Sequence, residues 1–490
     1  MGIDSKHPDY SASIGDWTQC RDSFDGEKAI KKKGTTYLPP TASHYADGMN
    51  SVQDVGYKAY EAYKTRAVFP SYYTDAVEAY LGLMWSKPPT IKVPKVMEAL
   101  LENATNHKES LEQLLRKINE EQLKVGRVGI LADLPKTPDP ANPLPYITLY
   151  LSEKIINWDE GMATENGQDS LNLVVLDETA QERGSDFSWT TKNRYRVCII
   201  GKVNENEKTG TYRVGVFEGQ NTTFNETELL DPMIRGKKLE EIPFAFINSK
   251  DNVASPDKPA LLPLSELCLT IYRGEADYRQ NLYMQGQDTL VKIGVPSDDE
   301  ATRIGAGAVI NVPAGGDAKF IGVSSAGLSE QRQALESDKQ LAAHKAGTLI
   351  DIKSGQKEAG DTLKVRIAAQ TATLNQIALS GAAGLAKVLK IIATWMGANP
   401  EEVEVTPNLD FANLEMEGAN LVQLMTAKKL GAPLSLESIH QLMVARNLTT
   451  KTYEEETDAI EEEAPLPGSG TEEGGNPPDP VTGGTGGKDQ

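Results

Sequence analysis

The chain has 490 residues, 39% of them hydrophobic, and a formal net charge of -20. This length predicts two to four domains or a single elaborated one, and the apolar content is enough for a folded core. The chain has 50 Lys and Arg residues but 70 Asp and Glu residues. This composition argues against a protein that binds nucleic acid tightly over its whole surface, although it does not exclude weaker contact with DNA.

Two helical segments are expected first. Residues 47–85 are rich in aromatic side chains at helical spacing, and the sequence SKPP at 86–89 cannot continue a helix. Residues 108–124 carry leucine and isoleucine on one stripe, and Gly126 ends this segment.

The hydrophobic period then changes to two, which is typical of strands. Six short β-type runs separated by Pro, Gly, Asn and Asp are expected at 127–133, 146–151, 171–177, 195–200, 212–217 and 242–248. Such runs after a helical start predict an α+β fold with a mostly antiparallel sheet.

A helix of about six turns should follow Pro263 and end at Gln285. Short β-like pieces at 288–323 form a compact insertion, and a further helix is expected from Ser329, as its N-cap, to Ile350. That helix is polar on most faces, so it needs partners on several sides or water.

The charged loop DIKSGQKEAG at 351–360 leads into a long helix at 362–396, which would span about 50 Å if straight. Gly381 and Gly384 should bend this helix or admit a close neighbour. An extended segment after Glu401 and helices at 419–430 and 436–446 are expected next. The tail 464–490 follows an acidic run and contains 8 Gly and 5 Pro, so we expect it to be disordered.

Motifs for nucleotide or acyl chemistry are missing. The chain has no phosphate-binding loop and no GxSxG, and Gly305-Ala306-Gly307 lacks the third glycine of a dinucleotide fingerprint. The five histidines show no metal-ligand spacing, and the many acidic residues neither single out nor exclude a two-metal nuclease site. We therefore expect no enzyme activity, no cofactor and no metal site.

Two patterns have two interpretations each. The tyrosines within 57–80 could stack on bases, but stripes at helical spacing are more often core. The lysine run at 31–33 could contact a phosphate backbone, but a run of three is more often a solvated turn. We favour the core and the turn.

The cysteine and hydropathy patterns indicate a reducing compartment and no anchor. Cys20, Cys198 and Cys268 lie far apart without a CxxC pair, and the N-terminus resembles neither a signal peptide nor a myristoylation motif. The uncharged stretch 367–386 is long enough to cross a bilayer, but polar residues interrupt it, so we interpret it as a packed helix of a soluble protein.

Several strings along about 440 residues resemble one family. They are HPDYSASIGDWTQCRDSFDGEKAIKKKGTTYLPP, GRVGILADLP from Gly126, EKIINWDEG, EEIPFAFINS, PLSELCLTIYRGEADYRQNLY, GAGAVINVPAGGDAKFIGVSSAGLSEQRQAL and WMGANPEEVEVTPNLDF. In this order they resemble the portal proteins of tailed double-stranded DNA phages, in a subgroup filed as a domain of unknown function.

The resemblance implies a ring, usually of twelve subunits, through which DNA enters and leaves at one capsid vertex. It implies a wing at 1–260, stem helices at 261–286 and 328–350, a clip at 287–327, a tunnel loop at 351–361, a long kinked helix at 362–397, a wing/crown region at 398–463 and the tail at 464–490. The tunnel loop would place Lys353, Ser354, Gly355, Gln356, Lys357 and Glu358 at the channel, and Gly381 and Gly384 would form the helix kink.

The partners implied are double-stranded DNA, the terminase large subunit, a head–tail adaptor, and the major capsid and scaffolding proteins of a virion, with no membrane. Two other classes stay open as alternatives. A packaging enzyme, such as a terminase or nuclease subunit, is disfavoured by the missing phosphate loop and metal spacing. A non-portal minor head protein is disfavoured because such proteins are typically shorter and lack this order of elements.

Overall fold

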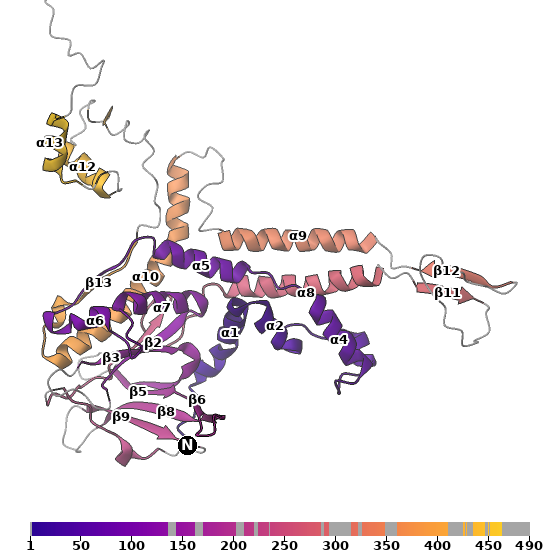
Figure 1. Cartoon of the computed structure of the whole chain (residues 1–490), viewed down its shortest axis with the longest axis horizontal. Coiled ribbons are helices and arrows are strands. Elements are labelled where there is room, and N and C mark those ends of the chain that lie inside the picture. The colour runs from indigo at the N-terminus through magenta and orange to yellow at the C-terminus, as the bar shows by residue number, and fades with distance from the viewer. Residues whose placement is uncertain are drawn as a thin grey trace, which may run out of the picture. The chain divides into compact units, whose positions relative to one another are not determined.

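The computed structural model describes residues 2–135, 144–161, 170–201, 210–219, 224–234, 236–285, 289–293, 315–321, 326–347, 360–409, 425–426, 428, 435–445, 449 and 451–462 (Figure 1). The chain divides into two compact units, Met1–Phe411 and Ala412–Gln490. The first unit is a mixed α+β structure and the second contains two described helices of its own.

The chain begins with helices that the sequence patterns did not reveal. They are α1 (Pro8–Asp25), α2 (Glu27–Lys32) and α3 (Ala42–Ala46). The expected helix at 47–85 is wrong as one element, because it is divided into α4 (Val55–Arg66) and α5 (Tyr72–Met84). Ala67 is extended at the end of α4, and Pro70 disfavours helical backbone in the residue before it.

Helix α7 (Leu111–Lys124) lies within the predicted segment 108–124 and begins with a capping box, in which Ser110 and Gln113 bond each other's backbone N–H. It follows the short α6 (Ala99–Glu102). Short 3-10 turns complete the helical elements, at Gly34–Thr36, Lys95–Met97, Ser152–Lys154, Glu226–Glu228 and Pro400–Glu402.

Two sheets form the β part of the first unit. A three-stranded sheet has the order β10 (Phe244–Asn248), β2 (Arg127–Asp133), β3 (Tyr146–Leu151). A four-stranded sheet has the order β4 (Ile155–Gly161), β5 (Ser170–Asp177), β8 (Arg194–Gly201), β9 (Thr211–Glu218). In both sheets the neighbouring strands pair antiparallel, as predicted. All six predicted strands are present in these two sheets, and β4 is a seventh strand that the sequence analysis did not predict.

Three two-stranded pairs stand beside these sheets. Strand β1 (Thr90–Lys92) pairs with β13 (Glu404–Thr406), β6 (Ala180–Arg183) with β7 (Trp189–Lys192), and β11 (Thr289–Ile293) with β12 (Asp317–Ile321). The last pair confirms β structure in the predicted insertion 288–323, and β13 is the extended segment expected after Glu401.

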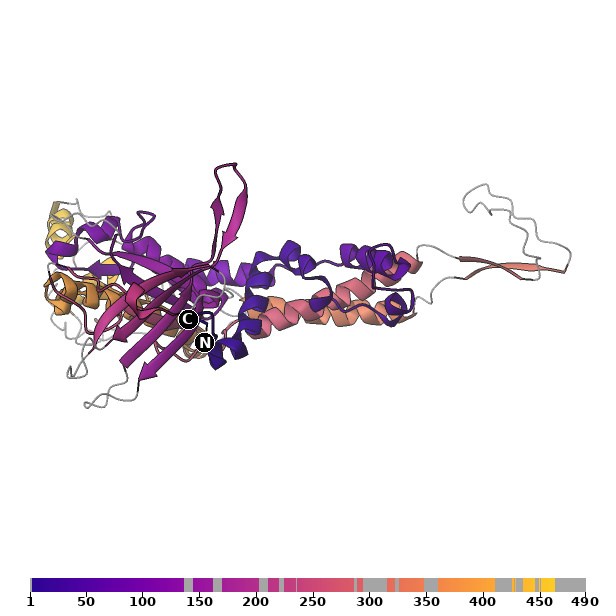
Figure 2. The same ribbon diagram turned by 90° about the horizontal axis from the view of Figure 1, so that it is seen from below.

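Three long helices follow the sheets. Helix α8 (Leu262–Gln285) and helix α9 (Ala326–Gly347) lie side by side, and α10 (Gly360–Met396) packs on β10 and α7 (Figures 1 and 2). All three were predicted within a few residues. Ser329 is not the N-cap of α9, because the helix already begins at Ala326.

The core explains the aromatic and apolar patterns. Tyr60, Tyr63, Tyr73 and Tyr80 are buried in a cluster that joins α4, α5, α8 and α9, which confirms for these four that the tyrosine stripe is core. By length and composition alone the segment 371–396 of α10 could cross a membrane, but 67% of its most apolar window is buried inside the protein. Its burial against β10, β2 and α7 accounts for its hydropathy.

The second unit contains α12 (Leu436–Ala445) and α13 (Tyr453–Glu462), with the rings of His440 and Tyr453 5.5 Å apart. Helix α12 agrees with the predicted segment 436–446. The acidic run forms most of α13, which had not been predicted as a helix. Most of the helix expected at 419–430 and all of the tail 464–490 lie outside the described residues.

Candidate functional site

The candidate site is the paired helices α8 and α9. The resemblance assigns them to the stem, and of the two only α8 is covered along its length by other described parts of the chain. Helix α4 holds the second half of α8. The Tyr63 hydroxyl donates to Asp277 Oδ1 at 2.6 Å, Arg66 donates to Gln280, and the Arg66 guanidinium lies 4.2 Å from the centre of the Tyr283 ring. These contacts join segments more than 200 residues apart in sequence.

The first half of α8 is held by α1. The hydroxyls of Ser23 and Ser265, both buried, lie 2.7 Å apart, and Gln19 donates to Ser265 at 3.1 Å. Further along, Arg273 donates from Nε to the carbonyl of Tyr37 at 2.9 Å. Helix α8 is therefore fixed along its length by the N-terminal helices that run beside it (Figure 2).

A buried ion pair joins α8 to α9. Glu275 on α8 is only 4% exposed and accepts from Lys339 Nζ on α9 at 2.7 Å and from Arg279 Nε at 2.5 Å. Burial by itself raises the pKa of Glu275, but the hydrogen bonds from Lys339 and Arg279 outweigh it, so the pKa lies below its ordinary value. The carboxylate is thus charged and fully engaged between the two helices.

Two more contacts fix the register of α9. Asn281 Nδ2 donates to Gln331 at 3.0 Å, and Gly274 makes room for Leu335, whose Cδ1 would lie 3.0 Å from a Cβ at that position. At the end of α9, the Tyr80 hydroxyl of α5 donates to the carbonyl of Ala346 at 3.0 Å. That bond fixes the described end of α9 to α5.

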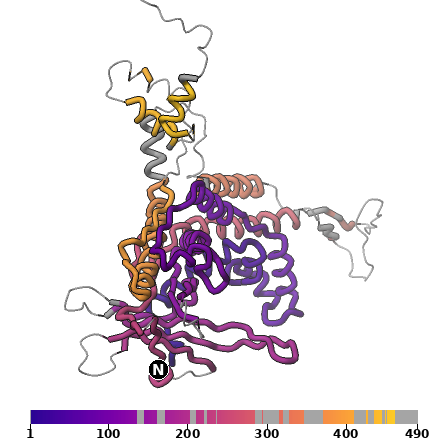
Figure 3. Tube along the Cα trace, turned by 60° about the vertical axis from the view of Figure 1, so that its left-hand side comes forward, coloured from indigo at the N-terminus to yellow at the C-terminus, as the bar shows by residue number. Residues whose placement is uncertain are grey.

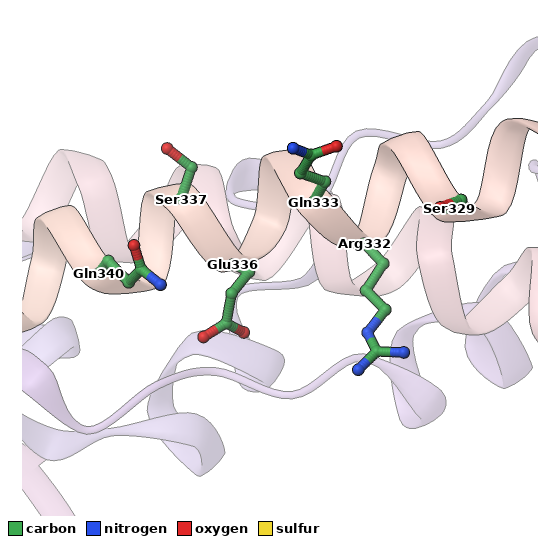
Figure 4. A pocket seen from close by; sticks show the side chains of 6 residues that line it. All are labelled: Ser329, Arg332, Gln333, Glu336, Ser337 and Gln340. Atoms are coloured by element: carbon green, nitrogen blue, oxygen red, sulfur yellow. The ribbon is translucent and has the colours of Figure 1, made fainter.

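The other face of α9 is uncovered in the described part of the chain. Six polar residues of this face line an open pocket of about 520 Å³; they are Ser329, Arg332, Gln333, Glu336, Ser337 and Gln340. Figure 4 shows that the side chains of Arg332 and Glu336 project on the same side of the helix. We call this set the α9 outer face. The helix has three acidic residues and three Lys or Arg between 326 and 347, so it carries no net charge.

Helix α10 reaches the sheet through its two predicted glycines. A Cβ at Gly384 would lie 2.6 Å from Ile247 Cδ1 on β10, and a Cβ at Gly381 would lie 2.7 Å from Gln122 Oε1 on α7. Both distances are too short for a real side chain, so the glycines admit close neighbours, which was one of the two expected roles. The bend expected at these glycines stays a prediction.

A buried polar cluster surrounds the two glycines. Gln122 Nε2 donates to the carbonyl of Asn248 at 2.7 Å, and Ser380 Oγ donates to the same carbonyl at 2.8 Å. Asn119 donates to Gln122 at 3.0 Å and accepts from the Trp85 indole at 3.2 Å. Helices α5, α7 and α10 are thereby fixed to the end of β10, and each buried donor that makes such a bond avoids a large desolvation cost.

The predicted channel residues Lys353, Ser354, Gly355, Gln356, Lys357 and Glu358 lie outside the described residues. The bracing of α8 by the N-terminal helices is a feature of the site that sequence reasoning missed. One signal was available, since the resemblance already included the string at 7–40 that forms α1 and α2.

Metal-ligating, nucleophilic and cationic side chains were located among the described residues. No group of three or more His, Cys, Asp or Glu side chains that could hold a metal ion occurs among them. Burial raises the pKa of each of the thiols Cys20, Cys198 and Cys268 to about 12, so they are protonated rather than nucleophilic at neutral pH. The interpretation of the lysine run 31–33 as a turn is wrong, because Lys31 and Lys32 end helix α2 and Lys33 is its C-cap. Lys31 pairs with Glu27 one turn earlier in this helix, and Lys33 pairs with Asp22.

Residues 260–396 match a family model described as Domain of unknown function (DUF4055). The match begins just before α8 and ends with α10, so it covers the candidate site. It agrees with the resemblance to a subgroup filed as a domain of unknown function. The family's description states no function. No curated protein matches the chain.

Three solved chains are similar in structure. A chain described as "Virion of native gene transfer agent (GTA) particle" has a TM-score of 0.39 and 12% identity over 79% of this chain and 92% of that chain. A chain of "Neck of native GTA particle computed with C12 symmetry" has a TM-score of 0.37 and 12% identity over 78% of this chain and 90% of that chain. A chain of "Neck of empty GTA particle computed with C6 symmetry" has a TM-score of 0.37 and 14% identity over 78% of this chain and 91% of that chain. These likenesses are remote, and none of the descriptions names a portal.

Proposed function

We propose that this chain is a portal-type subunit that assembles with copies of itself, twelve being the expected number, into a ring around a channel for double-stranded DNA. In this proposal it has no catalytic role and works at one vertex of a virion. The observation that carries the proposal is the unequal coverage of the α8–α9 pair. Helix α8 is held along its length by its own chain, whereas α9 has a polar face that the described residues leave uncovered.

The chemistry of the α9 outer face fits contact between copies or with a channel. A helix that is polar on most of its faces buries little apolar surface by itself, so in a folded protein it meets water or the polar surface of a partner. The face pairs one cation and one anion with four uncharged polar groups, which suits hydrogen bonding to a neighbouring subunit.

The charge of the chain suits a channel through which DNA slides. Each phosphate contact made by Lys or Arg strengthens binding and makes it salt-dependent. A chain with a net charge of -20 and a neutral α9 does not offer a continuous attractive surface to a polyanion. The alternative of a packaging enzyme lacks a specific observation in its favour.

The finer assignments belong to the same proposal. The wing at 1–260 would contact the major capsid and scaffolding proteins, and the clip at 287–327 would receive the terminase large subunit and later the head–tail adaptor. The tunnel loop at 351–361 would lie at the narrowest part of the channel and the region from 398 on the head side. In this proposal the paired strands β11 and β12 would belong to the clip.

Native mass spectrometry and negative-stain images of the purified full chain test the ring directly. We expect closed rings of about twelve copies at micromolar concentration. The variant Gln333→Glu with Gln340→Glu adds two negative charges to the α9 outer face and should weaken assembly, whereas Asn103→Asp with Asn106→Asp adds two charges at an exposed turn and should not. A chain that forms only a stable dimer under all conditions would contradict the proposal.

A further inference from the structure

One stripe of α8 is exposed although the helix is held along its length. Its four side chains follow one another at three- and four-residue steps, so they lie on one side of the helix; they are Glu266, Thr270, Arg273 and Asp277. We call this set the α8 outer stripe. Arg273 donates to the carbonyl of Tyr37 and Asp277 accepts from the hydroxyl of Tyr63, which are both uncharged groups. Among the described residues, no side chain of opposite charge pairs with the three charged members of the stripe.

The α9 outer face also contains unpaired charges. Arg332 and Glu336 project on the same side of α9 (Figure 4), and in the described part of the chain neither side chain has a hydrogen bond or an ion pair. Figures 1 and 3 show α9 on the opposite side of α8 from α4, so the helices that hold α8 do not cover these two residues. Both charges are therefore available to a partner.

The contact between α8 and α9 sets which of their residues lie at the same level. The helices run antiparallel, as the ion pair and the hydrogen bond between them show. A Cβ at Gly274 would lie 3.0 Å from Leu335 Cδ1, so these two residues are level with each other. Counting three residues forward from Gly274 and three back from Leu335 makes Asp277 level with Arg332.

The α8 outer stripe and the α9 outer face lie on opposite sides of the helix pair. At about 100° per residue, the two charged residues of the α9 outer face lie about 60° and 100° around the helix from the residue that faces α8. The nearest two charges of the α8 outer stripe lie at the same angles from Gly274, but in the opposite sense of rotation. Because the helices are antiparallel, opposite senses give opposite sides. A subunit of a ring needs such an arrangement, since it meets one neighbour on each side.

We propose that the α8 outer stripe of one copy packs against the α9 outer face of the next, with Asp277 beside Arg332 and Arg273 beside Glu336. Arg273 is level with Glu336 by the same count. A rotation about a ring axis that runs along both helices keeps level residues level, so the register within one copy is also the register between copies. Both charged pairs are then attractive, which is why a second copy is the occupant that fits.

The charge pattern also disfavours a slipped contact. A shift of one copy by one helical turn would place Asp277 beside Glu336, and two carboxylates at that distance repel each other. The pattern therefore selects one register among those that two polar helices could adopt. The inference rests on the proposed ring and adds to it the surface of α8 and the residue pairs that join the subunits.

Crosslinking of the full chain tests the contact. Thr270 lies within one residue of the level of Gln340, so Thr270→Cys with Gln340→Cys and a short bismaleimide should link copies into a ladder of dimers, trimers and larger species. Thr270→Cys with Ser329→Cys is the matched control, because Ser329 is on the same face but about 16 Å further along α9, and it should give no ladder. The three native thiols are fully buried and should not react.

Native mass spectrometry of the same samples separates this contact from the ring. Closed rings without a ladder from the first variant, or an equally strong ladder from the control, would overturn the contact and leave the ring standing. A ladder without closed rings would keep the contact and contradict the ring. A monomer without a ladder would contradict both.

Exchange of the two charges on α9 tests the pairing. Arg332→Glu with Glu336→Arg keeps the net charge but places each residue beside a like charge of the next copy. The concentration of half-assembly should rise about tenfold at low salt and less at high salt. Hydrogen exchange of α9 in the unassembled variant should match that of the parent chain. Glu112→Arg with Arg116→Glu, the same exchange on the exposed face of α7, is the control and should not change assembly. Unchanged assembly of the α9 variant would refute the pairing.

Discussion

The ion pair at Glu275 offers the sharpest test of how α8 and α9 are joined. Replacing Lys339 by Met removes the donor at 2.7 Å but keeps a side chain of similar length on α9. Glu275 then stays buried with Arg279 alone, and the Arg279 side chain is 45% exposed. A hydrogen bond to a charged group contributes about 1.5–3 kcal/mol, so the contact between the helices should weaken by that amount.

Hydrogen exchange by mass spectrometry is the suitable assay, since a chain with more than one compact unit has no single unfolding free energy. In the unassembled protein, peptides from 326–347 of Lys339→Met should open about 10- to 150-fold more often than in the parent chain. Arg332→Met, on the uncovered side of the same helix, is the control and should change the opening free energy by less than about 0.5 kcal/mol.

The pH dependence gives an independent check. The folded-state pKa of Glu275 lies below the ordinary value of 4.5, so the pair stabilises the contact above that value and the contribution is lost as the pH falls through the folded pKa. In Lys339→Met one of the two hydrogen bonds that lower the pKa of Glu275 is lost, so the carboxyl should protonate at a higher pH than in the parent chain. The difference in the opening free energy of α9 between the parent chain and Lys339→Met should therefore become smaller as the pH falls below the ordinary pKa of Glu275. Unchanged exchange in α9 at neutral pH would refute the reasoning.

Four further predictions follow from the helices, the loop and the tail. Gly384→Ala forces a methyl group into the β10 isoleucine and should destabilise the first unit by about 1–3 kcal/mol, whereas Gly82→Ala, with open space around it in α5, should stabilise by up to about 1 kcal/mol; thermal unfolding compares them. Lys353→Glu with Lys357→Glu should leave assembly intact but impair DNA packaging or retention, and normal yields of filled particles would place the loop outside the channel. The purified chain should neither hydrolyse ATP nor cut DNA with Mg²⁺ or Mn²⁺, and turnover abolished by a point mutation in this chain would contradict that. Truncation after Glu463 should leave ring size and melting temperature unchanged, and loss of assembly would reveal a binding segment there.

The sequence by itself predicted those helices and strands that pack a continuous apolar face against the rest of the protein. In α7, leucine and isoleucine recur on one stripe because that helix packs one face against the sheet and α10. The six predicted strands were recognisable for the same reason, since alternation or a buried apolar run follows from having one face or both covered. Helices α8 and α10 were therefore recognisable before any contact was known, whereas α9, which is polar on most faces, was predicted with an N-cap at Ser329 that the structure does not have.

Only the tertiary structure decided where polar and aromatic residues belong. Helix α1 buries Asp22 and Ser23 beside its aromatic residues, because their partners are Tyr37 and Ser265, and the second of these lies 242 residues away. A helix whose buried face includes polar groups has no apolar stripe to recognise. For Gly384 the sequence left a bend or a close neighbour open, and only the packing of α10 on β10 showed the neighbour, since local propensity says nothing about which backbone approaches a glycine.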